Sequence, residues 1–369
     1  MLEPIGPYFQ RETSSGRCQE PLPEILGRIR RGSRRSGGGH NNPGLDIHQE
    51  DPPEPGSGGD GPQIPTCNWI PAVHLRGTQG DDDELQRGNR QGGFGSVYRG
   101  LLEDGKTPVA VKRLEGVTQG EAEFWAEVAV IGRINHINLV RVLGFCAEGK
   151  HRLLVYEYLE NGSLDRLLFA SDATKVLNWE KRYAVAVGTA MGLAYLHEEC
   201  LEWVLHCDVK PQNILLDEQY RPKLADFGMS KLTERGAAGV AIPVGRYMAP
   251  EWMVNQEITA KADVYSFGVV LLELVTGKSA TGVSEGQWNH LIRWVEEKME
   301  GRHGMDQMVD EGLNGGYDEV QAELVLRVAL FCVRTNKDER PAMSTVVGLL
   351  HGDLSPDDES SHGSLALRI

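Results

Sequence analysis

The segment that most constrains the fold of this chain is ADVYSFGVVLLELVTG, from Ala262 to Gly277, which is apolar on almost every side. A helix at the surface of a protein has one apolar face, whereas a helix that is apolar all round is buried. We therefore expect this segment to be a helix inside a large lobe. The chain is long enough for such a lobe, because it has 369 residues, of which 40% are hydrophobic and 25% are charged.

The two ends of the chain have a composition that does not suit a core. Residues 1–84 are dominated by Gly, Pro, Arg and acidic residues without apolar periodicity, which predicts a disordered low-complexity segment. We interpret the basic cluster RIRRGSRR as part of a solvated flexible arm, with a nuclear-import or anionic-surface patch as the alternatives. Residues 352–369 return to Ser, Asp, Gly and His and are expected to be a disordered tail.

Between these ends the sequence changes from strand patterns to helix patterns. FGSVYRG and TPVAVKRL alternate β-branched and polar residues around the turn-rich EDGK, which predicts a β-hairpin. EAEFWAEVAVIGRI has the spacing of a helical face, and RLLVYEYL predicts a buried strand. A long helix is expected over WEKRYAVAVGTAMGLAYLHEE, with one apolar face made of Tyr183, Val187, Ala190, Met191 and Ala194. The fold class is therefore α+β, with a small sheet first and helices afterwards.

The net charge and the cysteines narrow the classes of function. A formal net charge of -15 argues against nucleic acid as the main partner, because phosphate binding needs a surplus of Lys and Arg. Six cysteines without a CxxC pair, and no His at zinc-ligand spacing, favour a reducing compartment. The sequence contains no apolar run of about 18 residues and no secretory signal, so as written it is expected to be cytoplasmic without a membrane span.

The segment LHCDVKPQNILLD places an aspartate, a lysine and an asparagine at short fixed intervals. Asn213 follows Asp208 by five positions (213 minus 208), which is the D-x-x-x-x-N spacing of a phosphoryl-transfer loop. A loop of that length can aim the Asp208 carboxylate at an incoming hydroxyl while the Asn213 amide oxygen faces a metal ion. Lys210 can neutralise charge on the moving phosphoryl group. These three residues are the predicted catalytic residues.

Two further motifs complete a predicted nucleotide site. Asp226 in ADFG follows Asn213 by thirteen positions (226 minus 213) and would bind Mg²⁺ together with Asn213, while Phe227 packs between the lobes. VAVK places Lys112 at the end of a strand, and Glu127 follows it by fifteen positions (127 minus 112) on the next helix. We expect an ion pair between Lys112 and Glu127, in which Lys112 holds the α- and β-phosphates of ATP.

Each of these motifs is weak alone, because a lysine on a strand is usually solvated and DFG arises by chance, but their order is specific. GGFGSV, VAVK, Glu127, HCDVKPQN, DFG, APE and Arg340 occur in the order of the kinase signature set. From about Gly92 to Leu350, roughly seven tenths of the chain, the sequence resembles a eukaryotic protein kinase domain. LVRVLGFCAEGKHRLLVYEYLENGSLD, YMAPEW and KADVYSFGVVLLELVTGK closely resemble plant receptor-like serine/threonine kinases, particularly the group with lectin-type ectodomains.

The resemblance implies a two-lobed kinase fold, with a β-rich N-lobe at residues 85–159 and a mainly helical C-lobe at residues 160–351. It implies ATP and Mg²⁺ as cofactors and Ser or Thr hydroxyls of protein substrates as acceptors, because Lys210 is followed by Pro211 as in serine/threonine-specific members. Longer relatives are expected at the plasma membrane, with a membrane receptor complex as a further partner. Glu251 is expected to pair with Arg340.

The resemblance also implies which residues bind the nucleotide. Tyr156 would be the gatekeeper at the back of the ATP pocket, and the backbone from Glu157 to Leu159 would meet the adenine. The complete set of implied nucleotide-binding residues is Gly92, Gly93, Phe94, Gly95, Val97, Ala110, Lys112, Glu127, Tyr156, Glu157, Tyr158, Leu159 and Leu215.

The chain departs from the family pattern next to the catalytic aspartate. Cys207 stands where many kinases carry an arginine that binds a phosphate on the activation segment. A neutral thiol offers no bidentate donor, so activation is not expected to depend on a phosphate at that position. The activation segment itself offers only Ser230 and Thr233, and it carries Val244 where the family pattern has a threonine.

The phosphate-covering loop departs as well. Arg90 replaces its first glycine, and ELQRGNRQGG leaves no room for the apolar first strand that normally precedes it. Two functions therefore stay open. The first is an ATP- and Mg²⁺-dependent serine/threonine kinase in receptor-like kinase signalling, which we favour because the groups that stabilise the transition state remain. The second is a catalytically impaired pseudokinase that acts as a binding or scaffold module.

Overall fold

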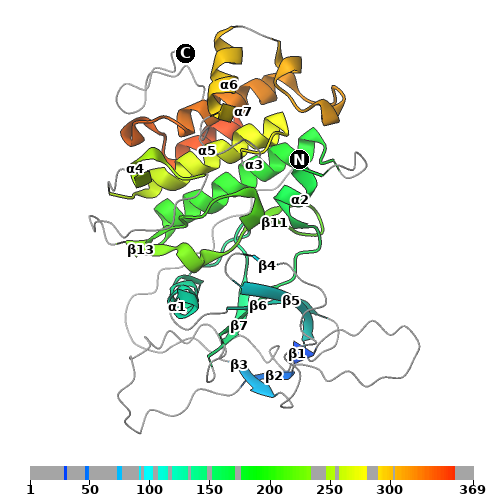
Figure 1. Ribbon diagram of the computed structural model, residues 1–369, viewed down its shortest axis with the longest axis vertical. Coiled ribbons are helices and arrows are strands. Elements are labelled where there is room, and N and C mark those ends of the chain that lie inside the picture. Colours follow the sequence, from blue (N-terminus) through cyan, green and yellow to red (C-terminus); the bar gives the residue numbers. More distant parts are fainter. Residues whose placement is uncertain are drawn as a thin grey trace, which may run out of the picture.

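The computed structural model has two lobes, a smaller one built on a β-sheet and a larger one built mainly of helices (Figure 1). This arrangement confirms the predicted α+β class with the two-lobed kinase architecture. The structure describes residues 29–30, 46–49, 73–76, 91–92, 95–102, 107–114, 119–131, 134–147, 152–170, 176–233, 247–253, 257–280, 290–301 and 304–353.

The central strands of the N-lobe are antiparallel. β5 (Gly95–Leu102) and β6 (Pro108–Arg113) form the predicted hairpin, although its turn lies outside the described residues. β6 also pairs with β8 (Leu153–Glu157), which in turn pairs with β7 (Val142–Cys146). Since side chains alternate across a strand, each strand of this sheet has two distinct faces.

These two faces have different roles. One face forms a small separate core made of Val109, Val111, Cys146, Leu153 and Val155. The other face carries Lys112, Leu154 and Tyr156, and both Leu154 and Tyr156 belong to the main core of the protein. The alternation therefore directs the side chain of Lys112 toward the C-lobe.

Short strands cover the outer edge of β5. β4 (Gln91–Gly92) pairs with the start of β5, and β1 (Ile29–Arg30) pairs with its end. β2 (Asp46–Gln49) and β3 (Val73–Arg76) extend the sheet beyond β1. These three strands are the part of residues 1–84 that the structure describes, and the disorder predicted for that range stays a prediction. An open sheet edge offers backbone N–H and C=O groups that pair without any apolar pattern in the partner segment, which is why periodicity gave no sign of them.

The predicted helix after β6 is present as α1 (Gln119–Ile131). Its residues Phe124 and Glu127 are 0% exposed. α1 packs against the one-turn helix η5 (Phe227–Met229), which contains part of the DFG motif. This contact brings a helix of the N-lobe against the chain segment that follows Asp226.

The C-lobe consists of helices joined by short strands and single helical turns (Figure 1). Its α-helices are α2 (Leu164–Leu168), α3 (Trp179–Ala194), α4 (Pro250–Met253), α5 (Ala260–Thr276), α6 (His290–Glu300), α7 (Glu319–Cys332) and α8 (Met343–His351). Its short strands are β9 (Gly162–Ser163), β10 (Trp203–Leu205), β11 (Ile214–Leu216), β12 (Pro222–Leu224) and β13 (Lys231–Thr233). Its remaining helical turns are η3 (Tyr195–Glu199), η4 (Pro211–Asn213), η6 (Met305–Gln307), η7 (Glu311–Leu313) and η8 (Lys337–Glu339).

Helix α5 is the buried central helix that the apolar segment predicts. Every residue from Ala262 to Thr276 is buried. The Thr259 side chain caps its N-terminus by accepting a hydrogen bond from the backbone N–H of Lys261. Gly277 ends it with a positive φ of 65°, and a Cβ there would lie 2.4 Å from Cγ of Asp310, so only glycine fits this end.

The predicted apolar face of α3 is correct only in part. Ala190 and Ala194 are buried, whereas Tyr183, Val187 and Met191 are half-buried. The reason is that α3 packs against α8, α5 and β12 at once, so more than one of its faces is covered. Even a polar residue of this helix is buried, since the Arg182 guanidinium is paired with carbonyl oxygens and a carboxylate.

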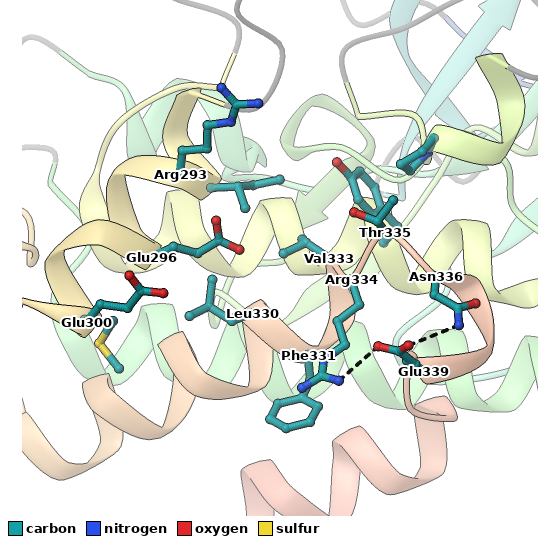
Figure 2. A pocket seen from close by; sticks show the side chains of 14 residues that line it. Arg293, Glu296, Glu300, Leu330, Phe331, Val333, Arg334, Thr335, Asn336 and Glu339 are labelled. Carbon is teal, nitrogen blue, oxygen red and sulfur yellow. Dashed lines mark hydrogen bonds and ion pairs between the residues drawn. The ribbon is translucent and has the colours of Figure 1, made fainter. Parts of the chain in front are cut away.

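A cavity of about 570 Å³ lies in the C-lobe between α5, α6, α7 and the turn that leads to η8 (Figure 2). Tyr265 of α5, Ile292 of α6 and Phe331 of α7 line it. None of the residues that line this cavity belongs to the predicted nucleotide site. The described helices include none that is long and apolar enough to cross a membrane.

Candidate active site

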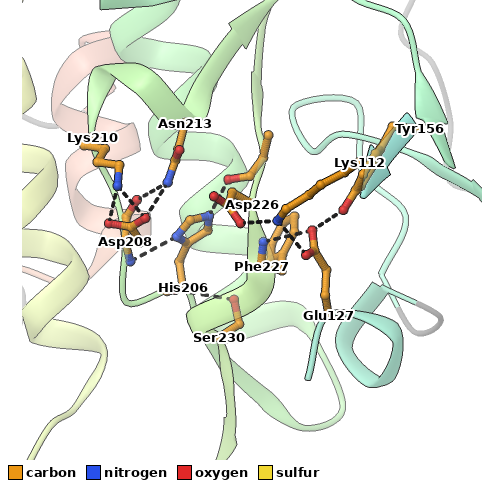
Figure 3. Close-up of polar contacts among 11 residues, drawn as sticks. Lys112, Glu127, Tyr156, His206, Asp208, Lys210, Asn213, Asp226, Phe227 and Ser230 are labelled. Carbon is orange, nitrogen blue, oxygen red and sulfur yellow. Dashed lines mark hydrogen bonds and ion pairs between the residues drawn. The ribbon is translucent and has the colours of Figure 1, made fainter. Parts of the chain in front are cut away.

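The residues that the sequence predicts for phosphate binding lie together between the lobes (Figure 3). Nζ of Lys112 lies 2.9 Å from Oε2 of Glu127, which confirms the expected ion pair. The same Nζ lies 2.6 Å from Oδ1 of Asp226. β6, α1 and the turn before η5 each supply one of these three side chains. Lys112 therefore links the N-lobe sheet, its helix and the DFG turn.

Two hydrogen bonds hold Glu127 in this position. The Tyr156 hydroxyl donates to Oε1 of Glu127, and the backbone N–H of Phe227 donates to the same oxygen at 3.3 Å. Phe227 is 0% exposed and its ring centroid lies 5.0 Å from that of His206. The Tyr156 hydroxyl bond is a contact that the sequence did not predict.

The electrostatics of this cluster follow from burial and pairing. Burial alone lowers the pKa of Lys112, but the charges of Glu127 and Asp226 outweigh it and raise that pKa above its ordinary value. Burial raises the pKa of Asp226, but Lys112 outweighs it, so the pKa of this carboxyl lies below its ordinary value. Burial, reinforced by Glu127, raises the pKa of Tyr156 well above its ordinary value. Lys112 and Asp226 are thus charged at neutral pH and the Tyr156 hydroxyl keeps its proton.

The three predicted catalytic residues also lie together. Nζ of Lys210 lies 2.9 Å and 2.7 Å from the two carboxylate oxygens of Asp208. Nδ2 of Asn213 donates to the backbone oxygen of Asp208 at 2.9 Å and to its Oδ2 at 2.8 Å. Burial raises the pKa of Asp208, and Lys210 opposes this rise. An aspartate in this environment can accept a proton from a hydroxyl group.

A buried aspartate that the sequence reasoning missed holds the catalytic loop, which is the segment that contains Asp208, Lys210 and Asn213. Oδ2 of Asp263, on α5, accepts hydrogen bonds from the backbone N–H of His206 at 2.8 Å and approaches Nε2 of His197 at 2.9 Å. Its Oδ1 accepts from the backbone N–H of Cys207 at 2.8 Å. Burial raises the pKa of Asp263, but the bond from His197 outweighs it and lowers this pKa below its ordinary value. An acidic residue inside a helix that is apolar almost all round was the signal that could have identified it.

Cys207 has an unusual backbone conformation. Its φ is 64°, a left-handed value that residues with a Cβ adopt only at an energetic cost. The bond to Asp263 and the bond from the backbone N–H of Asp208 to Nδ1 of His206, at 3.2 Å, hold the loop in this shape. The Cys207 thiol is half-buried beside the main core. The position before Asp208 is thus fixed through its backbone.

The start of the activation segment is held by strand pairing. β13 pairs with β10, with Leu205 opposite Lys231. Ser230 is 6% exposed, and its hydroxyl lies 3.4 Å from the backbone oxygen of His206. Residues 234–246, which contain Val244 and its neighbours, lie outside the described residues.

The other predicted nucleotide-binding residues line up along β5, β6, the chain after β8, and β11. Val97 is 41% exposed, and Ala110 and Leu215 are half-buried, so these apolar side chains keep an open surface. Tyr158 lies against Arg99, whose guanidinium carbon is 4.6 Å from the ring centroid. Glu157 forms an ion pair with Lys223 at 2.9 Å, and Gly162 donates its N–H to the Leu159 oxygen at 3.2 Å. Gly92 and Gly95 face each other in β4 and β5, while Gly93 and Phe94 lie outside the described residues.

The expected pair below the activation segment is present. Nη1 and Nη2 of Arg340 lie 2.7 Å and 2.8 Å from the two carboxylate oxygens of Glu251. Both side chains are buried, with Arg340 1% and Glu251 3% exposed. The bidentate geometry ties α4 to the chain before α8.

The remaining oxygen atoms of the site suit a divalent cation. Asn213 uses its Nδ2 toward Asp208, which leaves its Oδ1 as an acceptor, and Asp226 uses its Oδ1 toward Lys112, which leaves its Oδ2. Within the described part of the chain, no cluster of three or more His, Cys, Asp or Glu side chains could hold a metal. An amide and a carboxylate oxygen are instead the small donor set with which proteins hold Mg²⁺ beside substrate phosphates.

Comparison with known proteins agrees with the fold. Residues 90–347 match the family model described as the protein kinase domain, so the chain belongs to the protein kinase family. A protein kinase domain implies the use of ATP with a divalent metal ion and protein substrates.

Its relatives are plant kinases. The chain is 49% identical over 287 residues to ZmPK1 of Zea mays, which is named as a receptor protein kinase. The aligned region covers 74% of this chain and 34% of that protein. It is 45% identical over 306 residues to a G-type lectin S-receptor-like serine/threonine-protein kinase of Arabidopsis thaliana, covering 76% of this chain and 36% of that protein. It is also 42% identical over 285 residues to Cold-responsive protein kinase 1 of Arabidopsis thaliana, covering 75% and 73% of the two chains. The chain thus spans about a third of the length of the first two relatives.

Proposed function

We propose that this chain transfers the γ-phosphate of Mg-bound ATP to Ser or Thr hydroxyls of protein substrates. The observation that carries the proposal is the assembled cluster in which Lys112 contacts both Glu127 and Asp226 while Lys210 and Asn213 hold Asp208. Phosphoryl transfer depends mainly on positioning and electrostatic stabilisation, and these groups are already positioned.

Each residue has a defined task in this proposal. Lys112 binds the α- and β-phosphates, and Glu127 keeps its ammonium in place. Asp208 orients the substrate hydroxyl and takes its proton, while Lys210 compensates the charge of the transferred group. Asn213 and Asp226 are the residues that would hold Mg²⁺, which would supply positive charge beside the phosphates. The oxygen donors described above support this assignment.

The nucleotide base has its own predicted surface. Val97, Ala110 and Leu215 would enclose the adenine, with Tyr156 behind it and the backbone of residues 157–159 at its edge. Their exposure supports this, because an apolar residue with open surface between two lobes can accept a flat ring. The glycines of the phosphate-covering loop would contact the phosphates from above.

Cys207 bears on how the enzyme is switched on. We propose that activity does not require a phosphate bound at the position before Asp208, since a thiol cannot form the paired hydrogen bonds of an arginine. Two observations support the proposal: the Cys207 backbone is held by Asp263, and the start of the activation segment is held by the β10–β13 pairing. Activation-segment phosphorylation is then not needed to order these residues.

The relatives suggest a wider setting. Their names describe receptor or receptor-like kinases, and this chain spans only part of them. We propose that it works in receptor-like kinase signalling, with longer forms at the plasma membrane and a membrane receptor complex among its partners. The scaffold alternative gains no support from the described residues, because the six charged or polar side chains of the proposed catalytic cluster are all in place.

The test is to identify the phosphorylated amino acid. Purified chain is incubated with γ-labelled ATP, Mg²⁺ and a generic basic protein substrate, with and without a chelator of divalent cations. We expect labelled phosphoserine and phosphothreonine that disappear when the chelator is added, because the metal site is then empty. Label on tyrosine, or transfer that survives metal removal, would contradict the proposal.

A further inference from the structure

The C-lobe cavity has a wall of apolar side chains. Ile292 of α6, Phe331 at the end of α7 and Val333 after it are buried, and Leu330 and Met299 are half-buried. The volume of about 570 Å³ lies within the usual range for a site that accepts a ligand. An apolar side chain of a partner would therefore find a matching surface here.

One group of charges around the cavity is already compensated. Nη1 of Arg334 lies 3.1 Å from Oε2 of Glu339, and Nδ2 of Asn336 donates to its Oε1 at 3.1 Å (Figure 2). The Arg334 guanidinium also lies 4.7 Å from the centroid of the Phe331 ring. Arg334 is thus engaged twice, which leaves it little capacity to bind an anion.

A second group of charges is not compensated. Glu296 and Glu300 line the cavity one turn apart on α6, and neither makes a hydrogen bond or ion pair with the described residues (Figure 2). Arg293 lies one turn before Glu296, without an ion pair between them. Burial raises the pKa of Glu296, Glu300 reinforces this rise, and Arg293 opposes it. The two carboxylates therefore repel each other on the same side of the cavity.

The net charge of the residues that line the cavity is negative, because they include three glutamates and two arginines. A cation between Glu296 and Glu300 would remove the repulsion between the two carboxylates. Both carboxylates lie next to the apolar wall of the cavity. Lysine and arginine have this dual character, since a charged head is carried on an apolar stem. The complementary occupant is a peptide segment in which a basic residue stands beside a bulky apolar one.

The cavity also borders α4, the helix at the end of the activation segment. Pro250 of α4 lines it, next to Glu251 with its bidentate bond to Arg340. Tyr265 lines it as well, with the Arg340 guanidinium carbon 5.0 Å from its ring centroid. A protein held in the cavity would be tethered close to this segment.

We propose that this cavity is a docking site for a segment of the protein substrate that carries a lysine or arginine next to a bulky apolar side chain. The identification of the partner as a substrate rests on the proposed kinase function. The docking surface itself does not, because it shares no residue with the nucleotide site.

The first experiment measures binding without ATP. A fluorescein-labelled peptide with two arginines between two leucines, in a Gly and Ser background, is titrated with the full chain and followed by fluorescence anisotropy. We expect saturable binding, at least about tenfold tighter than for the same peptide with glutamates in place of its arginines. The Glu296→Gln/Glu300→Gln variant should bind the basic peptide about fivefold more weakly.

Two matched variants determine what causes the weaker binding of the basic peptide. Glu297→Gln changes a glutamate of the same helix that does not line the cavity, and its binding should equal that of the unaltered chain. Met299→Gln adds polarity to the wall at nearly constant volume and should weaken binding as well. Equal binding by the Glu296→Gln/Glu300→Gln variant, or no preference for the basic peptide, would overturn the proposal. Thermal unfolding of each variant verifies that it is folded.

The second experiment tests whether the partner is a substrate. The basic segment is joined by a flexible linker to a serine-containing acceptor peptide. We expect the unaltered chain to show about a fivefold lower KM for the joined peptide at unchanged kcat, and the double variant to lose this advantage. An unchanged KM would overturn the assignment to a substrate. If the chain binds the segment but transfers no phosphate, the docking site stands and the proposed function fails.

Discussion

Glu127 in the N-lobe and Glu273 in the C-lobe have nearly the same surroundings. Each is 0% exposed and accepts a hydrogen bond from a tyrosine hydroxyl, Tyr156 for Glu127 and Tyr247 for Glu273. Each also accepts a backbone N–H from a neighbouring segment. In hydrogen bonding alone the two carboxyl groups are close to equivalent.

The difference between them is a cation. Nζ of Lys112 lies 2.9 Å from Glu127, whereas Glu273 has no ion pair within the described residues and its Oε2 has no hydrogen-bond partner. Burial raises the pKa of Glu273 to about 8, and the nearby charge of Asp165 contributes to the rise. Glu273 is therefore protonated at neutral pH.

The comparison teaches where this fold keeps buried charge. Burying an unpaired charge costs several kcal/mol, so a carboxyl without a cation stays neutral and acts only through hydrogen bonds. Glu273 uses these bonds to hold Tyr247, just before α4, and Ala280 in place. At Lys112, Glu127 and Asp226 the buried charges are paired, and there the proposed function needs them for phosphate.

Removing the cation should give the largest effect. Lys112→Met deletes the ammonium that would align the phosphates and leaves two carboxylates facing each other. We expect kcat/KM for phosphate transfer to fall by about 10²–10³-fold. Lys298→Met, which changes a lysine of α6 outside the site, is the control and should keep its activity. A Lys112→Met variant with unaltered transfer would show that the cation has no role there.

Glu273→Gln should remove a pH dependence of stability. Because the folded pKa is about 8 and the ordinary value is 4.5, the folded chain holds a proton that the unfolded chain has released between these values. This contribution to the free energy of unfolding is full below pH 4.5 and is lost as the pH rises toward 8. Between pH 6 and 8, the free energy of unfolding of the variant should rise by about 2 kcal/mol relative to that of the unaltered chain, as measured by urea unfolding. Parallel pH profiles for the two proteins would mean that Glu273 is already ionised.

The two tyrosines provide a matched pair of smaller changes. Tyr156→Phe removes a hydrogen bond to a carboxylate that faces a lysine, and Tyr247→Phe removes one to a neutral carboxyl. We expect losses in the free energy of unfolding of about 2 and about 1 kcal/mol, since bonds to charged groups are the stronger ones. Chemical denaturation of both variants at one pH measures this difference. Reversal of the order would contradict the assigned protonation states.

The smallest effect is expected at Cys207. If no phosphate is bound before Asp208, treating the purified chain with a phosphatase should change its transfer rate by less than about twofold. The control is an arginine-containing kinase treated in the same way. A large fall in the rate would reveal a phosphate-binding group elsewhere in the activation segment.

The sequence predicted those elements that a local pattern of apolar and polar residues is sufficient to form. Helix α5 could be predicted because every side of it is apolar, and the β5–β6 hairpin because its residues alternate. The Lys112–Glu127 pair followed from the spacing of charged residues within the motif set. The bidentate Glu251–Arg340 pair followed from the family resemblance.

Contacts between distant segments could not be predicted in this way. The bond from Tyr156 to Glu127 and the bonds that Asp263 accepts from the catalytic loop join residues far apart in the sequence, and no spacing rule encodes them. The pairing of β1 with β5 uses backbone groups alone, which every segment possesses. The apolar face of α3 was wrong in part because several elements cover this helix at once.

The most direct test of the central claim combines binding and transfer in one sample set. Mg-dependent ATP binding and single-turnover γ-phosphate transfer are measured for the unaltered chain and for Asp208→Asn. If Asp208 orients and deprotonates the hydroxyl, the variant should bind ATP normally. It should transfer the γ-phosphate at least about 10²-fold more slowly. Equal transfer rates in the two proteins would contradict the account, because the chemistry would then not depend on the residue around which the site is built.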